Sequence, residues 1–219
     1  VVENEYTETE TYTDADGNEQ QREVTYIDAD VTLTSYYFNA LFECALQDGT
    51  TGILAGTEIS EQVWNYFRSL GFTEESTAAI MGNMYQESGM NPIALQNGIG
   101  PAAGICQWEK FQDPNSRWGR LNAYAESQGK SWMDLQCQLD FLMQELNGAD
   151  ATTKAIMDRD YGGLENFKRS TDINWAVEAF ERSFERAGIP NMQARYTQAN
   201  AYYAMYHGRE VVTDTDEEE

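Results

Sequence analysis

The sequence predicts an α-dominated (α+β) protein in which a helical domain lies between an acidic β-hairpin segment and an acidic tail. Strand-forming Thr, Tyr and Val crowd the first 34 residues, whereas from Glu58 onward apolar residues recur at the three- and four-residue spacing of helices. We therefore expect an acidic β-hairpin segment and linker over 1–57, a helical domain over 58–208, and an acidic disordered tail over 209–219.

The hairpin is expected between Glu5 and Thr34. Asp16-Gly17 interrupts the strand-forming run, and glycine readily adopts the positive φ angles that a tight hairpin turn requires. Both faces of this hairpin carry polar residues, so we do not expect it to be stable on its own.

Helical periodicity and capping residues place the helices that follow. Thr73 can cap a helix that has Glu74 and Glu75 in its first turn, and Gly89 can close it. Ser131 begins a capping-box pattern, which predicts a helix with Trp132 near its start. Together the patterns predict helices over about 58–70, 74–88, 115–128, 132–146, 176–187 and 190–203.

Composition excludes several classes of function. The net charge is −23, with −9 on residues 1–31 and −5 on residues 209–219, so a nucleic-acid partner is disfavoured. No apolar run is long enough to span a membrane. One histidine, His207, and three scattered cysteines (Cys44, Cys106 and Cys137) do not form a zinc pattern, so we expect no metal and no cofactor.

Glu87 stands out by its position. Ile80, Met84 and Glu87 are spaced i, i+4, i+7, which puts the carboxyl group on the apolar face of its helix. Two explanations are open. The first is structural: Glu87 forms an ion pair with an arginine or caps neighbouring backbone. The second is functional: apolar surroundings keep the carboxyl protonated. A protonated carboxyl can act as the general acid in glycoside cleavage.

Two motifs suggest a family. Glu87-Ser88-Gly89 with Asn91-Pro92, followed by Gly104-Ile105-Cys106-Gln107-Trp108, resembles the signature of the lysozyme superfamily that includes goose-type lysozymes and lytic transglycosylases. The closer resemblance is to the phage-tail-type lysozyme family, found in cell-wall hydrolases of phages and conjugative elements. It is carried by residues 63–67, 78–84, 135–142 and 184–188, with Arg195 and Ala199.

The resemblance implies a lysozyme-like fold with Glu87 as the catalytic acid and a substrate-binding set of Ser88, Gln107 and Trp108. Ser88 would support the helix end, Gln107 would reach the sugar or the attacking water, and Trp108 would stack on a sugar, although a Trp after a Gln is more often a core residue. The second carboxylate stays open among Glu109, Asp113 and Glu185.

The resemblance also implies the activity. We expect a peptidoglycan hydrolase that cleaves the β-1,4 bond between N-acetylmuramic acid (MurNAc) and N-acetylglucosamine. The alternatives are a lytic transglycosylase and a non-catalytic cell-wall-binding or assembly module. The partner is the glycan strand, and the site of action is extracellular or cell-wall-facing, with any anchor on a segment outside this sequence. Gly98–Pro101 and Glu109-Lys110 depart from the family pattern, so the groove shape is not predicted.

Overall fold

The computed structural model describes residues 3–13, 19–29 and 51–212, and the chain divides into two units, Val1–Cys44 and Ala45–Glu219. In the first unit, strand β1 (Glu3–Thr13) pairs antiparallel with β2 (Glu19–Ala29). The strand-forming run therefore does form a hairpin. The predicted Asp16-Gly17 turn and most of the predicted tail lie outside the described residues.

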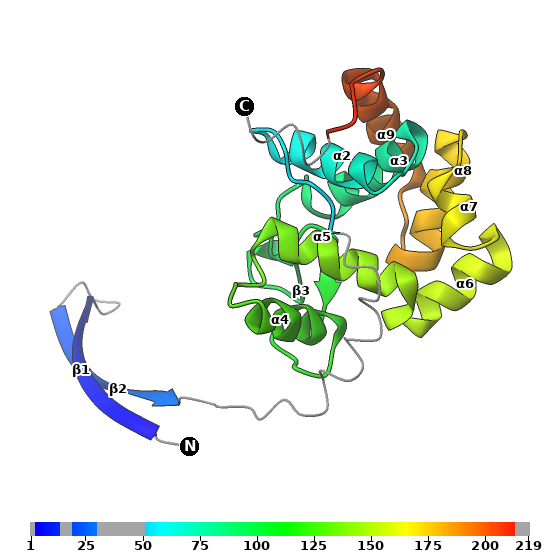
Figure 1. The fold of residues 1–219 in the computed structure, drawn as a ribbon. Helices are drawn as coiled ribbons and strands as arrows, with labels where there is room; N and C mark the ends of the chain where they lie inside the picture. Colours follow the sequence, from blue (N-terminus) through cyan, green and yellow to red (C-terminus); the bar gives the residue numbers. More distant parts are fainter. Residues whose placement is uncertain (1–2, 14–18, 30–50, 213–219) are drawn as a thin grey trace. The chain divides into compact units, whose positions relative to one another are not determined.

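The second unit is mostly helical, which confirms the α-dominated fold class (Figure 1). Its short β-hairpin consists of β3 (Ala102–Ala103) and β4 (Trp108–Glu109). A 3₁₀ turn covers Gln96–Gly98, and π-helical segments cover Glu145–Ala149 and Glu181–Glu185. The α-helices are α2 (Ile59–Ser69), α3 (Glu74–Ser88), α4 (Arg117–Ser127), α5 (Leu135–Gln144), α6 (Ala151–Tyr161), α7 (Leu164–Lys168), α8 (Ile173–Phe180) and α9 (Met192–Tyr206). Helices of the described part are too short or too polar to span a bilayer.

Helix α3 passes through the core and carries Glu87 in its last turn. Its ends are those that the sequence predicts: the Thr73 hydroxyl accepts a hydrogen bond from the Ser76 amide at 3.2 Å, and Gly89 ends the helix at φ +66°. Every residue from Ser76 to Met84 is buried. The helix is therefore fixed on all sides before its last turn reaches the surface.

Helices α3 and α9 lie side by side (Figure 1). Gly82 permits this approach, because a Cβ atom at that position would lie 2.6 Å from the Arg195 carbonyl oxygen and 2.7 Å from the Ala199 Cβ. Any larger residue at position 82 would force the two helix backbones apart.

Two predicted helix boundaries were wrong. Helix α5 begins at Leu135, because the Asp134 carboxylate caps it by accepting from the Cys137 amide at 2.9 Å. Ser131 instead begins a turn that the Asp134 amide closes at 3.0 Å, so Trp132 precedes the helix. Helix α8 ends at Phe180 and continues only as the π-helical segment, which leaves Ala187 outside it.

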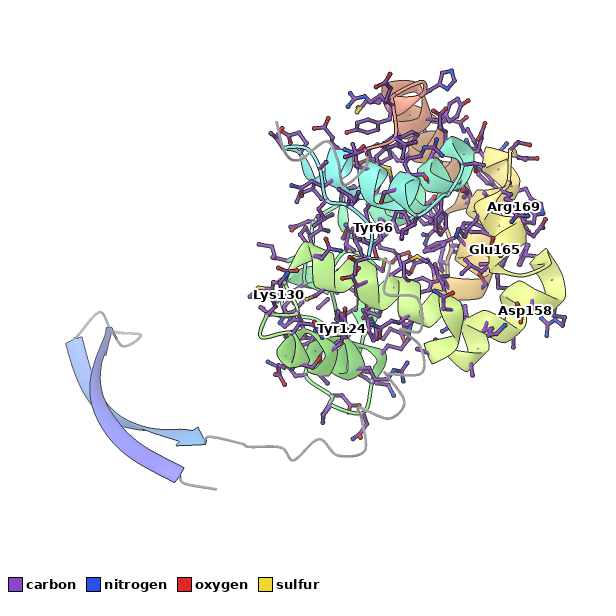
Figure 2. The ribbon with its side chains drawn as sticks, in the orientation of Figure 1. Tyr66, Tyr124, Lys130, Asp158, Glu165 and Arg169 are labelled. Carbon is purple, nitrogen blue, oxygen red and sulfur yellow. The ribbon has the colours of Figure 1, made fainter. Side chains whose placement is uncertain are left out.

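Residues 51–57, which we expected to be linker, contact the helical elements. The Ile53 amide donates to the Ser69 hydroxyl at 2.9 Å, and the Asn65 side chain donates to the Ala55 carbonyl at 2.7 Å. The Tyr66 ring (Figure 2) lies where a side chain at Gly52 would be, and its hydroxyl donates to Asp140 at 2.7 Å. Burial, followed by the negative charge of Asp140, raises the pKa of Tyr66 far above its usual value.

Candidate active site

The two motifs meet at the end of α3. The Ser88 hydroxyl donates to the Ile105 carbonyl at 2.8 Å and to the Met84 carbonyl at 3.2 Å, and it accepts from the Asn91 amide at 3.2 Å. Ser88 therefore ties the Glu-Ser-Gly motif to the Gly-Ile-x-Gln motif. Its hydroxyl makes its hydrogen bonds within the protein, and its role in binding substrate stays a prediction.

The Gly-Ile-x-Gln motif forms the turn between β3 and β4. Gly104 has φ +87°, and a Cβ atom there would lie 3.0 Å from both the Trp108 ring and the Gln138 side-chain oxygen. Gln138, on α5, is completely buried; it accepts from the Ile105 amide at 2.7 Å and donates to the carbonyls of Pro92 at 2.7 Å and Trp132 at 2.8 Å. One amide side chain thus fixes the turn against α5.

Glu87 is ion-paired with Arg195 of α9. Arg195 is 1% exposed and donates through Nη2 to Glu87 Oε1, through Nη1 to the Asn83 side-chain oxygen at 2.9 Å, and through Nε to the Pro190 carbonyl at 2.6 Å. The Glu87 side chain remains 20% exposed. The first of the two explanations for this glutamate, an arginine partner, is thus present in the structure. The pair also holds the carboxyl in one orientation at the surface.

Glu185, one of the three candidates for a second carboxyl, ends the second π-helical segment and is half-buried. Its Oε1 atom is buried and has no hydrogen-bond partner within the described residues. Burial raises the pKa of Glu185 well above its usual range, the negative charge of Glu87 raises it further, and Arg195 and Arg117 lower it.

The other two candidates have different settings. Glu109 is exposed on β4, two residues beyond Gln107. Asp113 accepts a hydrogen bond from the Asn115 amide at 2.9 Å in the turn before α4. Of the three candidates, only Glu185 has a buried carboxyl oxygen without a hydrogen-bond partner among the described residues.

Gln107 is the last residue of the turn and is partly exposed. Its amide nitrogen donates to the carbonyls of Gly104 at 2.8 Å and Ala94 at 3.2 Å. Within the described part of the chain its side-chain oxygen has no hydrogen-bond partner, so it is free to accept one from a sugar or a water.

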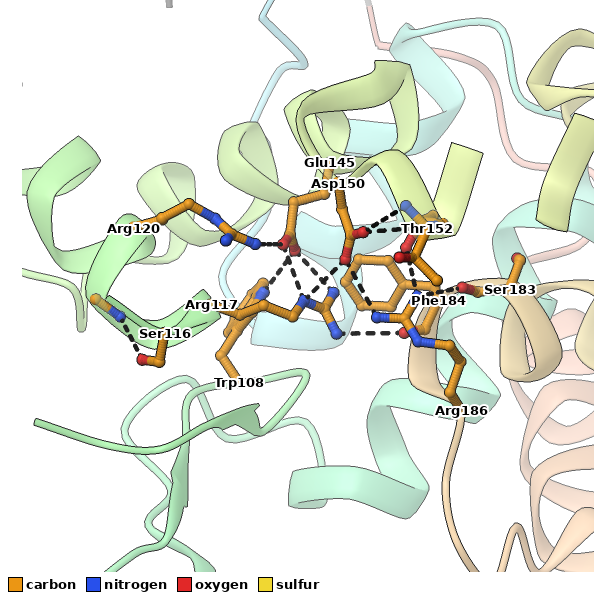
Figure 3. A network of polar contacts seen from close by, with 12 residues as sticks. Trp108, Ser116, Arg117, Arg120, Glu145, Asp150, Thr152, Ser183, Phe184 and Arg186 are labelled. Carbon is orange, nitrogen blue, oxygen red and sulfur yellow. Dashed lines mark hydrogen bonds and ion pairs between the residues drawn. The ribbon is translucent and has the colours of Figure 1, made fainter. Parts of the chain in front are cut away.

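Trp108 lies in the core with 1% of its surface exposed. Its indole nitrogen donates to Glu145 at 2.8 Å (Figure 3). Its ring packs edge-on against Phe141. Stacking on a sugar requires an open ring face, so this burial does not support the stacking role, which stays a prediction. The core position was the more frequent alternative for this tryptophan.

The cluster of charged side chains that Trp108 contacts through Glu145 was not predicted from the sequence. Glu145, fully buried, accepts two bonds of 2.9 Å from Arg117, and Asp150 lies 3.5 Å from Arg117 and 3.1 Å from Arg186 (Figure 3). Its residues lie on separate elements, so no spacing in the sequence reveals it. Among the described residues, no group of His, Cys, Asp or Glu side chains is arranged to hold a metal ion.

Residues 58–206 match the model of the phage tail lysozyme family. The chain belongs to this family. It is also similar to morphogenesis protein 1 of Bacillus phage B103, with 27% identity over 154 residues, which cover 68% of this chain and 40% of that protein. The chain thus spans less than half the length of that relative.

The Arg195–Glu87 pair lies inside the range matched by the phage tail lysozyme model. The sequence carries one signal for it: Arg195 occupies the same face of its helix as Met192 and Ala199. A charged residue on an otherwise apolar helix face indicates a buried partner, but not which one.

Proposed function

We propose that this chain is a muramidase that hydrolyses the β-1,4 MurNAc–N-acetylglucosamine bond, with Glu87 as the general acid. The observation that carries the proposal is the setting of Glu87. Its partly exposed carboxyl lies where the two lysozyme-type motifs meet and is oriented by the buried Arg195. We infer that the enzyme acts outside the cell or on its wall-facing side.

Arg195 suits the transition state. A protonated Glu87 gives its proton to the glycosidic oxygen as the bond to C1 breaks, and the carboxylate that remains gains the full attraction of the guanidinium. Because this attraction is greatest when Glu87 is ionised, Arg195 stabilises the transition state more than a bound state in which Glu87 still carries its proton.

Hydrolysis also needs a water on the opposite side of the sugar. The free oxygen of Gln107 can orient that water but cannot remove its proton. The exposed Glu109 can accept a proton, and this favours hydrolysis over the transglycosylase alternative, in which the C6 hydroxyl of the sugar replaces water.

The test is digestion of purified peptidoglycan, followed by borohydride reduction and mass spectrometry. Glu87→Gln is expected to lower the rate by at least about 100-fold, while the exposed Glu178→Gln on α8, which removes the same charge, keeps it. Reduced MurNAc ends support hydrolysis, and 1,6-anhydro-MurNAc ends would show a transglycosylase. Wall binding without any product would show a non-catalytic module.

A further inference from the structure

Arg195, the partner of Glu87, is held by two residues one turn apart on α3. Its Nη2 atom donates to Glu87, and its Nη1 atom donates to the side-chain oxygen of Asn83 at 2.9 Å and to the Asn83 carbonyl at 3.4 Å. Its Nε atom donates to the Pro190 carbonyl at 2.6 Å. The guanidinium is buried, so these contacts, rather than solvent, fix its direction.

Asn83 is itself fixed by two helices. It is completely buried, and its side-chain nitrogen donates to the Ala79 carbonyl at 2.9 Å, one turn earlier on α3, and to the Val177 carbonyl of α8 at 3.3 Å. Because a carbonyl can only accept and a guanidinium can only donate, these partners determine which way round the amide group lies. The side-chain oxygen of Asn83 therefore faces Arg195, and this one side chain connects α8, α3 and α9.

Asn83 satisfies the guanidinium without neutralising it. A buried arginine needs acceptors for its N–H groups, and a carboxylate at position 83 would provide one but would also offset the positive charge. The acceptors that Asn83 and Pro190 provide are uncharged. Among the described residues, Glu87 is the carboxylate that forms an ion pair with Arg195, so the positive charge acts on Glu87.

We propose that Asn83 is a positioning residue for the acid: it holds the Arg195 guanidinium against Glu87 and, because it is neutral, leaves the positive charge to that carboxyl. This role rests on the proposed function of Glu87. Asn83 is completely buried one turn before Glu87, so it acts on the reaction through Arg195 and not through the substrate. With the guanidinium already in place, no side chain has to move when Glu87 gives up its proton and becomes charged.

Other groups also act on the Glu87 carboxyl. Within the described part of the chain, the charged and titratable groups that do so are Arg195 of α9, Glu185 at the end of the second π-helical segment, and the buried thiol of Cys106 in the turn between β3 and β4. A substitution at position 83 leaves all three in the sequence. A change in the titration of Glu87 then reports on the new side chain and on Arg195.

Asn83→Asp keeps the shape of the side chain and adds a negative charge beside Arg195. The guanidinium is then shared between two carboxylates, and Glu87 gains a like-charged neighbour one turn away, so it keeps its proton to higher pH. We expect the alkaline limb of the pH–rate profile to move up by about one unit, and kcat at the optimum to fall by about tenfold or more. KM should stay within about twofold of the wild type, because the buried Asn83 does not contact the substrate.

Asn200→Asp is the matched control. Asn200 is exposed on α9, and its side-chain nitrogen donates to the Tyr196 carbonyl one turn earlier at 2.7 Å, as Asn83 does to Ala79. This variant should keep the wild-type pH–rate profile. A lower rate at every pH with an unmoved alkaline limb in Asn83→Asp would show a merely structural role and overturn the proposal.

Asn83→Ala tests the same contact without a buried charge. It removes the neutral acceptor, so the Arg195 guanidinium should rotate at least about tenfold faster, as measured by nitrogen-15 exchange NMR of its Nη–H groups. A rotation rate equal to that of the wild type would show that Asn83 does not hold the guanidinium, and would overturn the proposal even where Asn83→Asp does not fold.

A further measurement needs no activity. Carbon-13 NMR of glutamate carboxyls, with the Glu87 signal assigned by its loss in Glu87→Gln, follows the titration of Glu87 directly. We expect this titration to lie about one unit higher in Asn83→Asp than in the wild type and in Asn200→Asp. An identical titration in all three proteins would overturn the proposal. If the titration moves but the wild-type protein does not digest peptidoglycan, the proposed function alone fails.

Discussion

The hydroxyl of Ser88 and the carbonyl of Ile105 are joined by a 2.8 Å hydrogen bond that connects the end of the acid-bearing helix to the turn before Gln107. Both sides of the candidate site depend on this bond, because the helix end positions Glu87 and the turn positions Gln107.

Ser88→Ala is therefore expected to affect activity more than stability. Loss of the hydrogen bond should lower the free energy of unfolding by about 1 kcal/mol. A small displacement of the two segments should reduce wall lysis by about tenfold or more. Chemical denaturation and turbidity clearing measure the two effects. Ser127→Ala, which removes a hydroxyl bonded to the Tyr124 carbonyl at 2.6 Å, is the matched control and should keep its lysis rate. Full activity in Ser88→Ala would contradict the coupling.

Gln138→Ala, in contrast to Ser88→Ala, is expected to affect stability more than activity. Gln138→Ala leaves the Ile105 amide and the carbonyls of Pro92 and Trp132 without their partner in the interior. We expect a loss of about 3–5 kcal/mol in the free energy of unfolding, since several buried polar groups are orphaned together. Gln136→Ala, two positions away and only partly buried, is the comparison. Equal thermal stability of the two variants would show that Gln138 does not hold the turn.

Trp108 can be assigned to the core or to the substrate by one substitution. Trp108→Phe keeps most of the ring volume and removes the donor to the buried Glu145. We expect destabilisation by about 1–3 kcal/mol with little change in KM for soluble glycan fragments. A KM increased tenfold at unchanged stability would restore the stacking role on the sugar.

Asp150 gives a pH-dependent prediction. Burial opposes its ionisation, but the Thr153 amide, Arg117 and Arg186 outweigh burial and lower the pKa of Asp150. A lowered pKa contributes stability that is fully present above the usual pKa of about 4 and is lost as pH falls through the lower value in the folded state. Asp150→Asn preserves a residue type that caps helices and removes the charge.

The stability difference between wild type and Asp150→Asn should therefore be largest near pH 7, at about 1–3 kcal/mol. It should narrow as the pH falls below about 4. Thermal unfolding between pH 2 and 7 measures the trend. A constant difference across this range would mean that the charge of Asp150 contributes nothing.

The contacts of residues 51–57 with the helical domain lead to different expectations for two N-terminal deletions. Deletion of residues 1–50 should leave wall lysis intact if the hairpin is an accessory to the helical domain. Deletion of residues 1–57 also removes the contacts of Gly52, Ile53 and Ala55 with the helical domain, so we expect a lower melting temperature for this shorter protein. Identical melting temperatures would show that 51–57 acts only as a linker.

The helices around the candidate site could be predicted, because caps and helical spacing depend on neighbouring residues. The ion pairs of the site could not be predicted, because their partners lie far apart in the sequence. Thr73 and Gly89 define α3 because capping depends on adjacent residues. The partner of Glu87 is 108 residues away in the sequence, and no local pattern links the two.

The position of Glu185 could not be predicted for a related reason. It depends on a π-helical segment and on positive φ at Arg186, and neither interrupts the apolar spacing of Phe180 and Phe184. Helical periodicity therefore predicted a continuous helix through Ala187, which would have turned the Glu185 carboxyl in another direction.

Because Gly82 has no side chain, direct backbone contact sets the spacing between α3 and α9, the helices that carry Glu87 and Arg195. A spacing set in this way leaves no room for a larger residue at position 82. Two positions in the segment between the motifs are under no such restriction: Ile93 and Ile99 are exposed, at 58% and 84%. Substitutions at these two positions can change the exposed surface between the motifs without moving Glu87, so under the proposed function wall specificity can change there while the acid stays in place.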